Sequence, residues 1–550
     1  MATAGIFGWG PLGKSKTQDG GTQADYARAF QLRETSGCVW QTGCEVMMRE
    51  PKVDKMHEVS AEPSRRGLVE LLFIAMLMAG FCHLAQGATR TYQVDSDSDA
   101  PVLFGAERLT RALQQQDRSA GGQGALQVSI KILPAKDLGK ESYRISIKDG
   151  QLHIAGGDAA GAMYGALEAA ERIAAGIEPV HLNGVAGSPG MAIRAVKVNL
   201  PWMSYRVHAK YNWSHGHSSP KLHVIHGGGI GDALWNPLPE NYRITWMVRN
   251  EDFFLLRWCG PGFVREHIRI NNKPWTGGYY VGSECYVPAA NFFDKPDRPD
   301  CARWAFQRQR LFYIVWGRHL YDPKLDDATL ARAIDMQYGC ATGAKLIPAL
   351  DLASRTPLRI ATFFGATWDH TLYSEGFLTN KGFIDIRQVM KARPLDPTWL
   401  GVSAMINLEA RKVAPPVEAI TPLAVATAAE RDAREALVRL AEIKTANIAV
   451  ADEIADAATW AHLGLYLADK IRAAVALERY SRGLNDNGRE ESVILLQKCL
   501  KHWDEVIALT KDRFLETPLQ HTGSVPFSWT RYRAAVAADI LTAEKTTKQP

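Results

Sequence analysis

Apolar and polar residues alternate in several short runs between residues 91 and 157, a pattern typical of β-strands with one buried face. Two of these runs, YRISIK and QLHIAGG, are joined by Asp149 and Gly150, a dipeptide that favours a tight hairpin. The next run, at 158–176, has small and apolar residues at helical spacing between an aspartate and a glycine, which are common helix caps. The pattern predicts a small α/β domain at 88–188.

Two strand-and-helix pairs are predicted between residues 242 and 323. The stretch YRITWMVRNEDFFLLRWCGPGFVREHIR changes from a strand-like run to helical spacing, and GGYYVGSECYV is followed by the amphipathic LFYIVWGRHLYDP. Successive βα units of this kind build (β/α)8 barrels. We therefore expect a barrel-like catalytic domain at 189–415.

Long runs that are rich in Ala and Leu follow residue 415, and their apolar residues recur at helical spacing. They predict a helical bundle at 416–550. The predicted fold class is therefore α/β multidomain, with a small α/β accessory domain, a (β/α)8-type barrel and a C-terminal α-helical bundle.

The N-terminal region has the pattern of an export signal at 56–87. Arg65 and Arg66 precede an apolar stretch shorter than the roughly 20 residues of a spanning helix, and small residues follow at the spacing of a cleavage site. We expect a mature protein that begins near Ala88, is secreted or periplasmic in a bacterium, and has no stable membrane insertion after cleavage; a membrane anchor is the alternative. Residues 1–55 lack sustained periodicity, and we interpret them as a non-native or disordered extension.

Composition narrows the range of partners. The 550 residues are 46% hydrophobic, enough for a large core, and 64 basic against 59 acidic side chains give a net charge of +5. No long basic run that could follow a phosphate backbone is present, so nucleic acid is not an expected partner. The eight cysteines show no CxxC spacing, and a bridge between Cys285 and Cys301 stays open.

The stretch ESYRISIKDGQLHIAGGDAAGAMYGALEAAERI, followed by AIRAVKVNLPW, resembles the accessory domain and first barrel strand of glycoside hydrolase family 20 hexosaminidases and family 67 α-glucuronidases. The predicted βα units resemble barrel proteins known as α-glucuronidase-like glycosyl hydrolases. The resemblance implies a non-catalytic accessory domain, a barrel that carries the chemistry, and C-terminal helices that support a homodimer. A carbohydrate is then the expected partner.

The predicted barrel is too short for eight βα units. A first strand near 192–200 should be followed by several units before the strand that begins at residue 242. Residues 203–241 are instead rich in Gly, Pro, Ser and His, with little strand or helix periodicity. We infer that two or three early units are missing and that the barrel is incomplete, which makes a catalytically inactive, carbohydrate-binding relative the alternative to an active enzyme.

Glycoside hydrolysis generally uses two carboxyl groups, one protonated and one ionised. Glu284 is the first candidate, because it is the only carboxylate in an aromatic stretch at the end of a predicted barrel strand, where barrel enzymes place catalytic groups. Its partner candidates are Asp252, Asp369 and Glu375. For each of them a structural salt bridge is the alternative interpretation.

Side chains suited to a sugar lie near these acids in the sequence: aromatic faces for pyranose rings, and arginine and asparagine for hydroxyls or a carboxylate. The predicted substrate-binding residues are Trp202, Arg249, Asn250, Arg257, Trp258, Tyr280, Tyr286 and Trp368, with Trp246, Trp275 and Tyr279 as further aromatic faces. The two arginines favour a uronic acid. The sequence thus predicts a secreted glycoside hydrolase that cleaves O-glycosidic bonds of a polysaccharide or oligosaccharide by a two-carboxylate mechanism.

Five histidines between His208 and His226 offer a third hypothesis, a zinc-dependent hydrolase. No nearby acid completes a ligand set, and the Gly-x-Ser-x-Gly motif that would accompany an esterase is absent from the sequence. A solvated loop is the simpler interpretation. Because the sequence also has no nucleotide-binding fingerprint, we expect neither a metal nor another cofactor.

Overall fold

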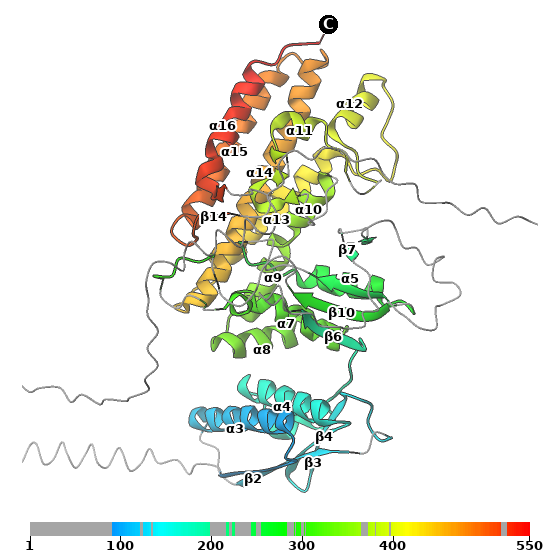
Figure 1. The fold of residues 1–550 in the computed structure, drawn as a ribbon, viewed down its shortest axis with the longest axis vertical. Helices are drawn as coiled ribbons and strands as arrows, with labels where there is room; N and C mark the ends of the chain where they lie inside the picture. The colour runs from blue at the N-terminus through cyan, green and yellow to red at the C-terminus, as the bar shows by residue number, and fades with distance from the viewer. Residues whose placement is uncertain are drawn as a thin grey trace, which may run out of the picture. The chain divides into compact units, whose positions relative to one another are not determined.

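The computed structural model places the described residues in one compact unit, Leu84–Pro550, within which the ribbon can be followed in Figure 1. The predicted extension at 1–55 and the predicted signal at 56–87 lie outside the described residues, and no described helix is long and apolar enough to cross a membrane. The structure describes residues 91–120, 125–133, 136–197, 216–218, 223–225, 244–248, 255–274, 276–282, 291, 293–298, 302, 304–364, 372–379, 381–394, 396, 398–518 and 525–549.

The predicted accessory domain contains a five-stranded sheet with the order β1-β2-β4-β3-β5. Its third and fourth strands form the predicted antiparallel hairpin, and Asp149 and Gly150 at the turn have φ angles of 50° and 72°. Positive φ at both positions is what such a two-residue turn requires. The strands are β1 (Thr91–Ser96), β2 (Ala125–Ile132), β3 (Tyr143–Lys148), β4 (Gln151–Gly156) and β5 (Ala186–Gly187).

Two helices, α3 (Ala100–Ala120) and α4 (Ala159–Ala174), lie side by side on one face of this sheet (Figure 1). The predicted cap at Asp158 is present, since its side chain accepts the Gly161 N–H at 2.8 Å. The helices approach closely because they meet at small residues: a Cβ added to Gly105 would lie 2.9 Å from the Ala166 Cβ. The predicted small α/β fold is confirmed.

Three parallel strands follow, in the order β6-β10-β9. The chain passes from β9 (Ile244–Val248) through α5 (Pro261–Asn271) to β10 (Thr276–Gly282), as predicted, while β6 (Ile193–Lys197) lies on the other side of β10. This order is that of the first strand of a closed (β/α)8 barrel beside its last two. The described residues do not close a barrel.

Helices cover one face of this parallel sheet. On β10, Tyr279 is fully buried, and its hydroxyl lies 3.0 Å from Nδ1 of His267 on α5. Trp316, on α7 (Arg310–Tyr321), also contacts the Tyr279 ring. Successive strand residues point to opposite faces, so Tyr280 lies on the other face, where Ile193 of β6 is 48% exposed.

The rest of the described chain is mostly helical, and α14 is its central element: it packs against α9 to α13 and α15, while α16 packs on α15. The helical region predicted at the C-terminus is confirmed. The remaining helices are α6 (Ala305–Arg308), α8 (Asp327–Tyr338), α9 (Gly343–Ala353), α10 (Arg355–Phe363), α11 (Ile386–Met390), α12 (Val402–Ala410), α13 (Pro422–Ala441), α14 (Ile448–Ser481), α15 (Gly488–Thr510) and α16 (Trp529–Glu544).

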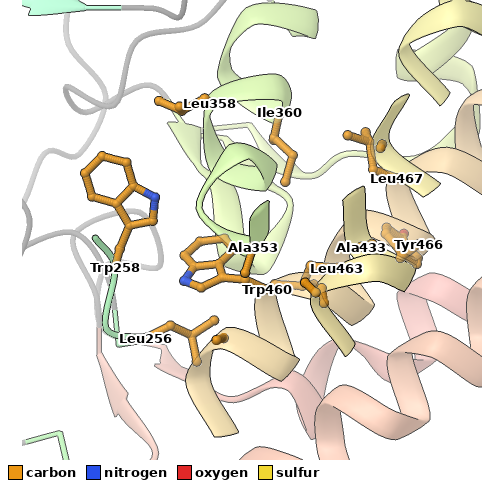
Figure 2. Close-up of a cluster of buried hydrophobic side chains, with 14 of the residues drawn as sticks. Leu256, Trp258, Ala353, Leu358, Ile360, Ala433, Trp460, Leu463, Tyr466 and Leu467 are labelled. Carbon is orange, nitrogen blue, oxygen red and sulfur yellow. The ribbon is translucent and has the colours of Figure 1, made fainter. Parts of the chain in front are cut away.

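The parallel strands and the C-terminal helices share one hydrophobic core. Figure 2 shows Leu256 and Trp258, from the loop after β9, beside Trp460 of α14 and Ala353 of α9. The Trp460 indole Nε1 also donates to the Arg257 carbonyl at 3.1 Å. The C-terminal helices therefore support the loop at the carboxyl end of β9 directly.

Candidate functional site

Most of the predicted site residues lie outside the part of the chain that the structure describes, so their roles stay predictions. Of the His208–His226 stretch, only the backbone of the antiparallel pair β7 (Gly216–Ser218) and β8 (His223–Ile225) is described. Within the described ranges, no group of three or more His, Cys, Asp or Glu residues could hold a metal ion. The undescribed candidates are Asp252, Glu284, Asp369, Trp202, Arg249, Asn250, Trp275, Tyr286 and Trp368.

Glu375 lies in a short turn, η3 (Ser374–Gly376), and has no exposed surface. Its two carboxylate oxygens accept the backbone N–H groups of Leu255 and Leu256, at 2.5 and 2.9 Å. Burial raises the pKa of this carboxyl well above its usual range, and the two amide hydrogen bonds only partly offset that. The geometry favours a residue that holds the loop after β9, and its predicted catalytic role stays a prediction.

Arg257 is the next residue of this loop, and it is buried against helix α14. Its backbone N–H and its Nη1 both donate to the Asp456 carboxylate, at 2.9 and 2.8 Å, and its Nη2 lies 3.4 Å from Asp452. Burial would lower the pKa of the guanidinium, but Asp456 and Glu453 outweigh burial and raise it. Because these contacts are with protein carboxylates, they favour a structural role over the predicted sugar contact.

The loop after β10 reaches the same place through Asp294, which is 2% exposed. Nε of Arg308 donates to Asp294 at 3.0 Å, while the Arg308 carbonyl accepts Nε of Arg257 at 3.1 Å. Burial would raise the pKa of Asp294, but the Arg308 and Arg257 guanidiniums lower it to about 2. Arg308 therefore contacts both loops, one through its side chain and one through its backbone.

Helix α14 supplies the acidic side of this site from a single turn. Asp452 and Asp456 also pair with Arg513, and the Glu453 carboxylate accepts the Tyr338 hydroxyl at 2.9 Å. Burial raises the pKa of Glu453 to about 7, although Arg257 opposes the shift. We call the following residues the loop-helix cluster: Arg257, Arg298, Arg308, Arg513, Asp294, Asp452, Glu453 and Asp456.

Four of the predicted aromatic faces are described. Trp246 and Tyr279 are 1% and 0% exposed and belong to the core, while Trp258 and Tyr280 differ from each other. Trp258 is 3% exposed, packs against Phe263 and Phe312, and donates its indole N–H to the Ser354 carbonyl at 2.9 Å. These contacts are those of a core residue. Tyr280 is half-buried and lies on the sheet face away from the helices, a position compatible with its predicted contact to a sugar.

The site brings together the loops that follow two neighbouring parallel strands, β9 and β10. In barrels and open parallel sheets alike, the carboxyl ends of such strands carry the reactive groups. In the sequence, Asp252 precedes Leu255 by three residues, and Glu284 follows Gly282 by two. The segment that contacts residues 255–260 begins at Phe293, nine residues after Glu284, so the contact lies farther along the chain from Glu284 than from Asp252.

The acidic turn of α14 was not predicted as part of a site. The signal for it is in the sequence ADEIADA, where Asp452, Glu453 and Asp456 interrupt an Ala-rich helix. Three acids within one turn of a helix that is rich in Ala and Leu need basic partners if that turn is buried. That argument could have drawn attention to Arg257.

Comparison with known proteins supports the fold. No protein-family model matches the chain, and no curated protein matches it. Among solved structures, one described as a GH138 enzyme targeting pectin rhamnogalacturonan II is similar at a TM-score of 0.61 and 12% sequence identity. The match covers 83% of this chain and 99% of that chain. The chain thus shares the fold of a glycoside hydrolase, and its α/β multidomain class is confirmed.

Proposed function

We propose that this protein is a glycoside hydrolase that cleaves O-glycosidic bonds of a polysaccharide. The observation that carries the proposal is the meeting of the loops after β9 and β10 through Arg257, Arg308 and Asp294, in a chain that shares its fold with a GH138 enzyme. The reaction needs two carboxyl groups at a defined separation, and barrel enzymes take their catalytic groups from loops at the carboxyl ends of the strands.

In this proposal Glu284 is one of the two carboxyl groups, and Asp252 or Asp369 is the other. One group, protonated, assists departure of the glycosidic oxygen, and the other, ionised, attacks the anomeric carbon or activates a water. Glu375 does not react with the substrate in this proposal. It holds the loop after β9, because both of its oxygens accept amide N–H groups of that loop.

The finer parts of the proposal are a uronic acid in the substrate, a relationship to α-glucuronidase-like hydrolases, export from a bacterial cell, and a homodimer through the C-terminal helices. The support for the uronic acid is the arginine content of the sequence near the site, with Arg249 as the remaining candidate contact. The pectin substrate of the GH138 enzyme is a reasonable first choice for testing this chain.

One observation favours a second candidate, a carbohydrate-binding relative without activity. Ile193 is 48% exposed, and Ala195 is also exposed, on the sheet face opposite the helices. In a closed (β/α)8 barrel that face is filled by packed side chains. Exposed positions on this face, among the residues that the structure describes, are what an incomplete barrel would leave.

The first prediction tests the proposal with Glu284→Gln. The amide keeps the shape of the side chain but cannot exchange a proton or attack, so kcat on rhamnogalacturonan II fragments or aryl uronides should fall by about 10³-fold or more. Sugar binding and the melting temperature should stay close to wild type. The exposed Glu107→Gln on α3 is the matched control, since Glu107 pairs with Arg111 of the same helix, in the accessory domain.

The outcomes separate the two candidates. Loss of turnover with retained binding supports the hydrolase. A wild-type protein that binds sugar but turns over no aryl glycoside, uronide or pectin fragment supports the binding relative. Full activity in Glu284→Gln removes this residue from the mechanism, and Asp252→Asn and Asp369→Asn then become the variants to compare.

A further inference from the structure

Helix α14 contacts both loops of the candidate site at a single turn. Asp456 accepts two hydrogen bonds from Arg257, one from the backbone N–H and one from Nη1, and so fixes the main chain of the loop after β9 as well as the side chain. Asp452 pairs with Arg298, which belongs to the loop after β10. One helical turn therefore contacts a loop from each of two neighbouring strands.

Arg308 joins the two loops directly. Its carbonyl accepts Nε of Arg257, and its own Nε donates to Asp294. Its guanidinium also lies over the rings of Phe293 and Phe514, at 5.6 and 5.3 Å from their centroids. Arg308 is 2% exposed, so each of these contacts is shielded from water.

A buried ion pair need not add to stability, because removing the two charges from water costs free energy. Well-packed apolar side chains often stabilise a core equally well, so a buried charged network adds mainly directional contacts with fixed geometry. Here Arg257, of the loop at 255–260, contacts Asp294 and the carbonyl of Arg308 at the end of α6. Arg298, of the segment at 293–298, contacts Asp452 of α14. The specific effect of these contacts is to fix the position of one loop relative to the other.

We propose that Asp456 and Arg308 are positioning residues of the hydrolase: through the loop-helix cluster they fix residues 255–260, after β9, relative to residues 293–298, after β10. This inference rests on the proposed function. The C-terminal helices are thus part of the active-site scaffold, beyond any role in dimers.

The test compares two buried aspartates with matched surroundings. Asp456→Asn keeps an acceptor for the Arg257 N–H but removes the charge. Asp432→Asn on α13 is the control: Asp432 is 2% exposed, and its ion pairs within the described chain are with arginines of α10 and α13, not of either loop. Because a displacement of about 1 Å can cost on the order of 10²-fold in rate, kcat should fall about 10- to 100-fold in Asp456→Asn with KM within about threefold.

Asp432→Asn should melt at a lower temperature than wild type but keep kcat within about twofold when assayed below its transition. A fall in kcat of equal size in both variants would mean that the effect is general destabilisation, and would overturn the proposal. Arg308→Lys provides a second variant if Asp456→Asn does not fold. It keeps the positive charge and loses the directed Nε contact, so the same fall in kcat is expected.

Amide hydrogen exchange provides a readout that does not depend on activity. In Asp456→Asn and Arg308→Lys, residues 255–260 and 293–298 should lose protection together, while in Asp432→Asn they should keep it. If the wild type turns over no substrate, the proposed function fails, and joint loss of protection still shows that the cluster positions the loops. Unchanged protection of both loops in both variants overturns the positioning role whatever the activity.

Discussion

Helix α14 carries two buried groups of charged side chains that differ in how fully their hydrogen-bonding capacity is used. In its C-terminal half, Lys470 donates to the Ile384 carbonyl at 2.6 Å and the Tyr466 hydroxyl at 2.7 Å, and pairs with Asp539 at 2.8 Å. The ammonium group thus has two hydrogen bonds and one ion pair, and only Oδ2 of Asp539 in this group is without a hydrogen-bond partner among the described residues. Asp539 in turn accepts the N–H of Ile386, the first residue of α11, so this pair joins three helices.

The loop-helix cluster, at the N-terminal end of the same helix, is less complete. Both terminal nitrogens of Arg308, and Nη1 of Arg298, are buried without a hydrogen-bond partner among the residues that the structure describes. Glu375, which adds a further acid beside the cluster, has a pKa that burial raises well above its usual range. Buried polar groups are normally satisfied, so incomplete pairing is a feature of places where position serves function.

Breaking the Lys470 pair should have the largest effect on stability. Lys470→Met removes the charge but not the bulk, and it leaves the Asp539 carboxylate buried without its counterion. Loss of one partner from a buried pair costs about 3–5 kcal/mol. Denaturant titration of the folded protein measures the loss, with the double variant Lys470→Met/Asp539→Asn as the control.

The double variant should recover much of that loss, because the amide that replaces the Asp539 carboxylate is neutral and can still accept the Ile386 N–H. If Lys470→Met costs less than about 1 kcal/mol, the pair is not the tightly matched structural contact described above, and its contrast with the loop-helix cluster disappears.

Glu453 should make the stability that the loop-helix cluster contributes depend on pH. Its pKa of about 7 is raised by burial, with Arg257 opposing and Asp456 adding to the shift. Because the folded pKa lies above the ordinary value, the folded protein holds this proton more tightly than the unfolded chain does. The stability that this provides is fully present below the unfolded pKa and is lost as pH rises through about 7.

Glu453→Gln should therefore flatten the fall in stability between about pH 4.5 and pH 7, by up to about 3 kcal/mol. Denaturant titrations across that range, for both proteins, measure it. Glu171 provides the control, since burial also raises its pKa to about 7 but it pairs with Arg318, away from the loops. Glu171→Gln should flatten the curve without altering exchange in the loop at 255–260. Parallel curves for wild type and Glu453→Gln would mean that Glu453 does not carry the proton.

The elements that sequence predicted correctly are those set by local pattern. The hairpin at Asp149 and Gly150, the helix cap at Asp158 and the βα units before and after α5 all depend on neighbours a few residues apart. The C-terminal helical region was equally evident from its spacing. These features depend on interactions between residues close together in the chain, so a single sequence is enough to predict them.

The surroundings of Arg257, Trp258 and Glu375 could not be predicted in this way. Glu375 binds an amide 120 residues earlier in the chain, and Arg257 pairs with an acid 199 residues later. A tryptophan and an arginine beside a barrel strand suit a sugar site and a core equally well, and only the tertiary partners distinguish them. Asp252, Glu284 and Asp369 lie outside the described residues, so for them the prediction stands as made.

The smallest effect we predict concerns Trp258, which belongs to the core side of this comparison. Trp258→Phe keeps an aromatic ring but removes the N–H that the Ser354 carbonyl accepts, and it leaves a small cavity beside Phe263 and Phe312. An unsatisfied buried acceptor and a small cavity together should cost about 1–2 kcal/mol of stability. The affinity for sugar should stay within about twofold, because protein atoms cover the ring.

Tyr280→Ala is the opposite case, and it serves as the comparison for Trp258→Phe. The Tyr280 side chain is half-buried on the face away from the helices, so sugar affinity should fall while stability changes less. Denaturant titration and calorimetric sugar binding on both variants separate the two roles. Weaker sugar binding in Trp258→Phe at unchanged stability would return Trp258 to the substrate site, and the loop after β9 would then have to open to admit the sugar.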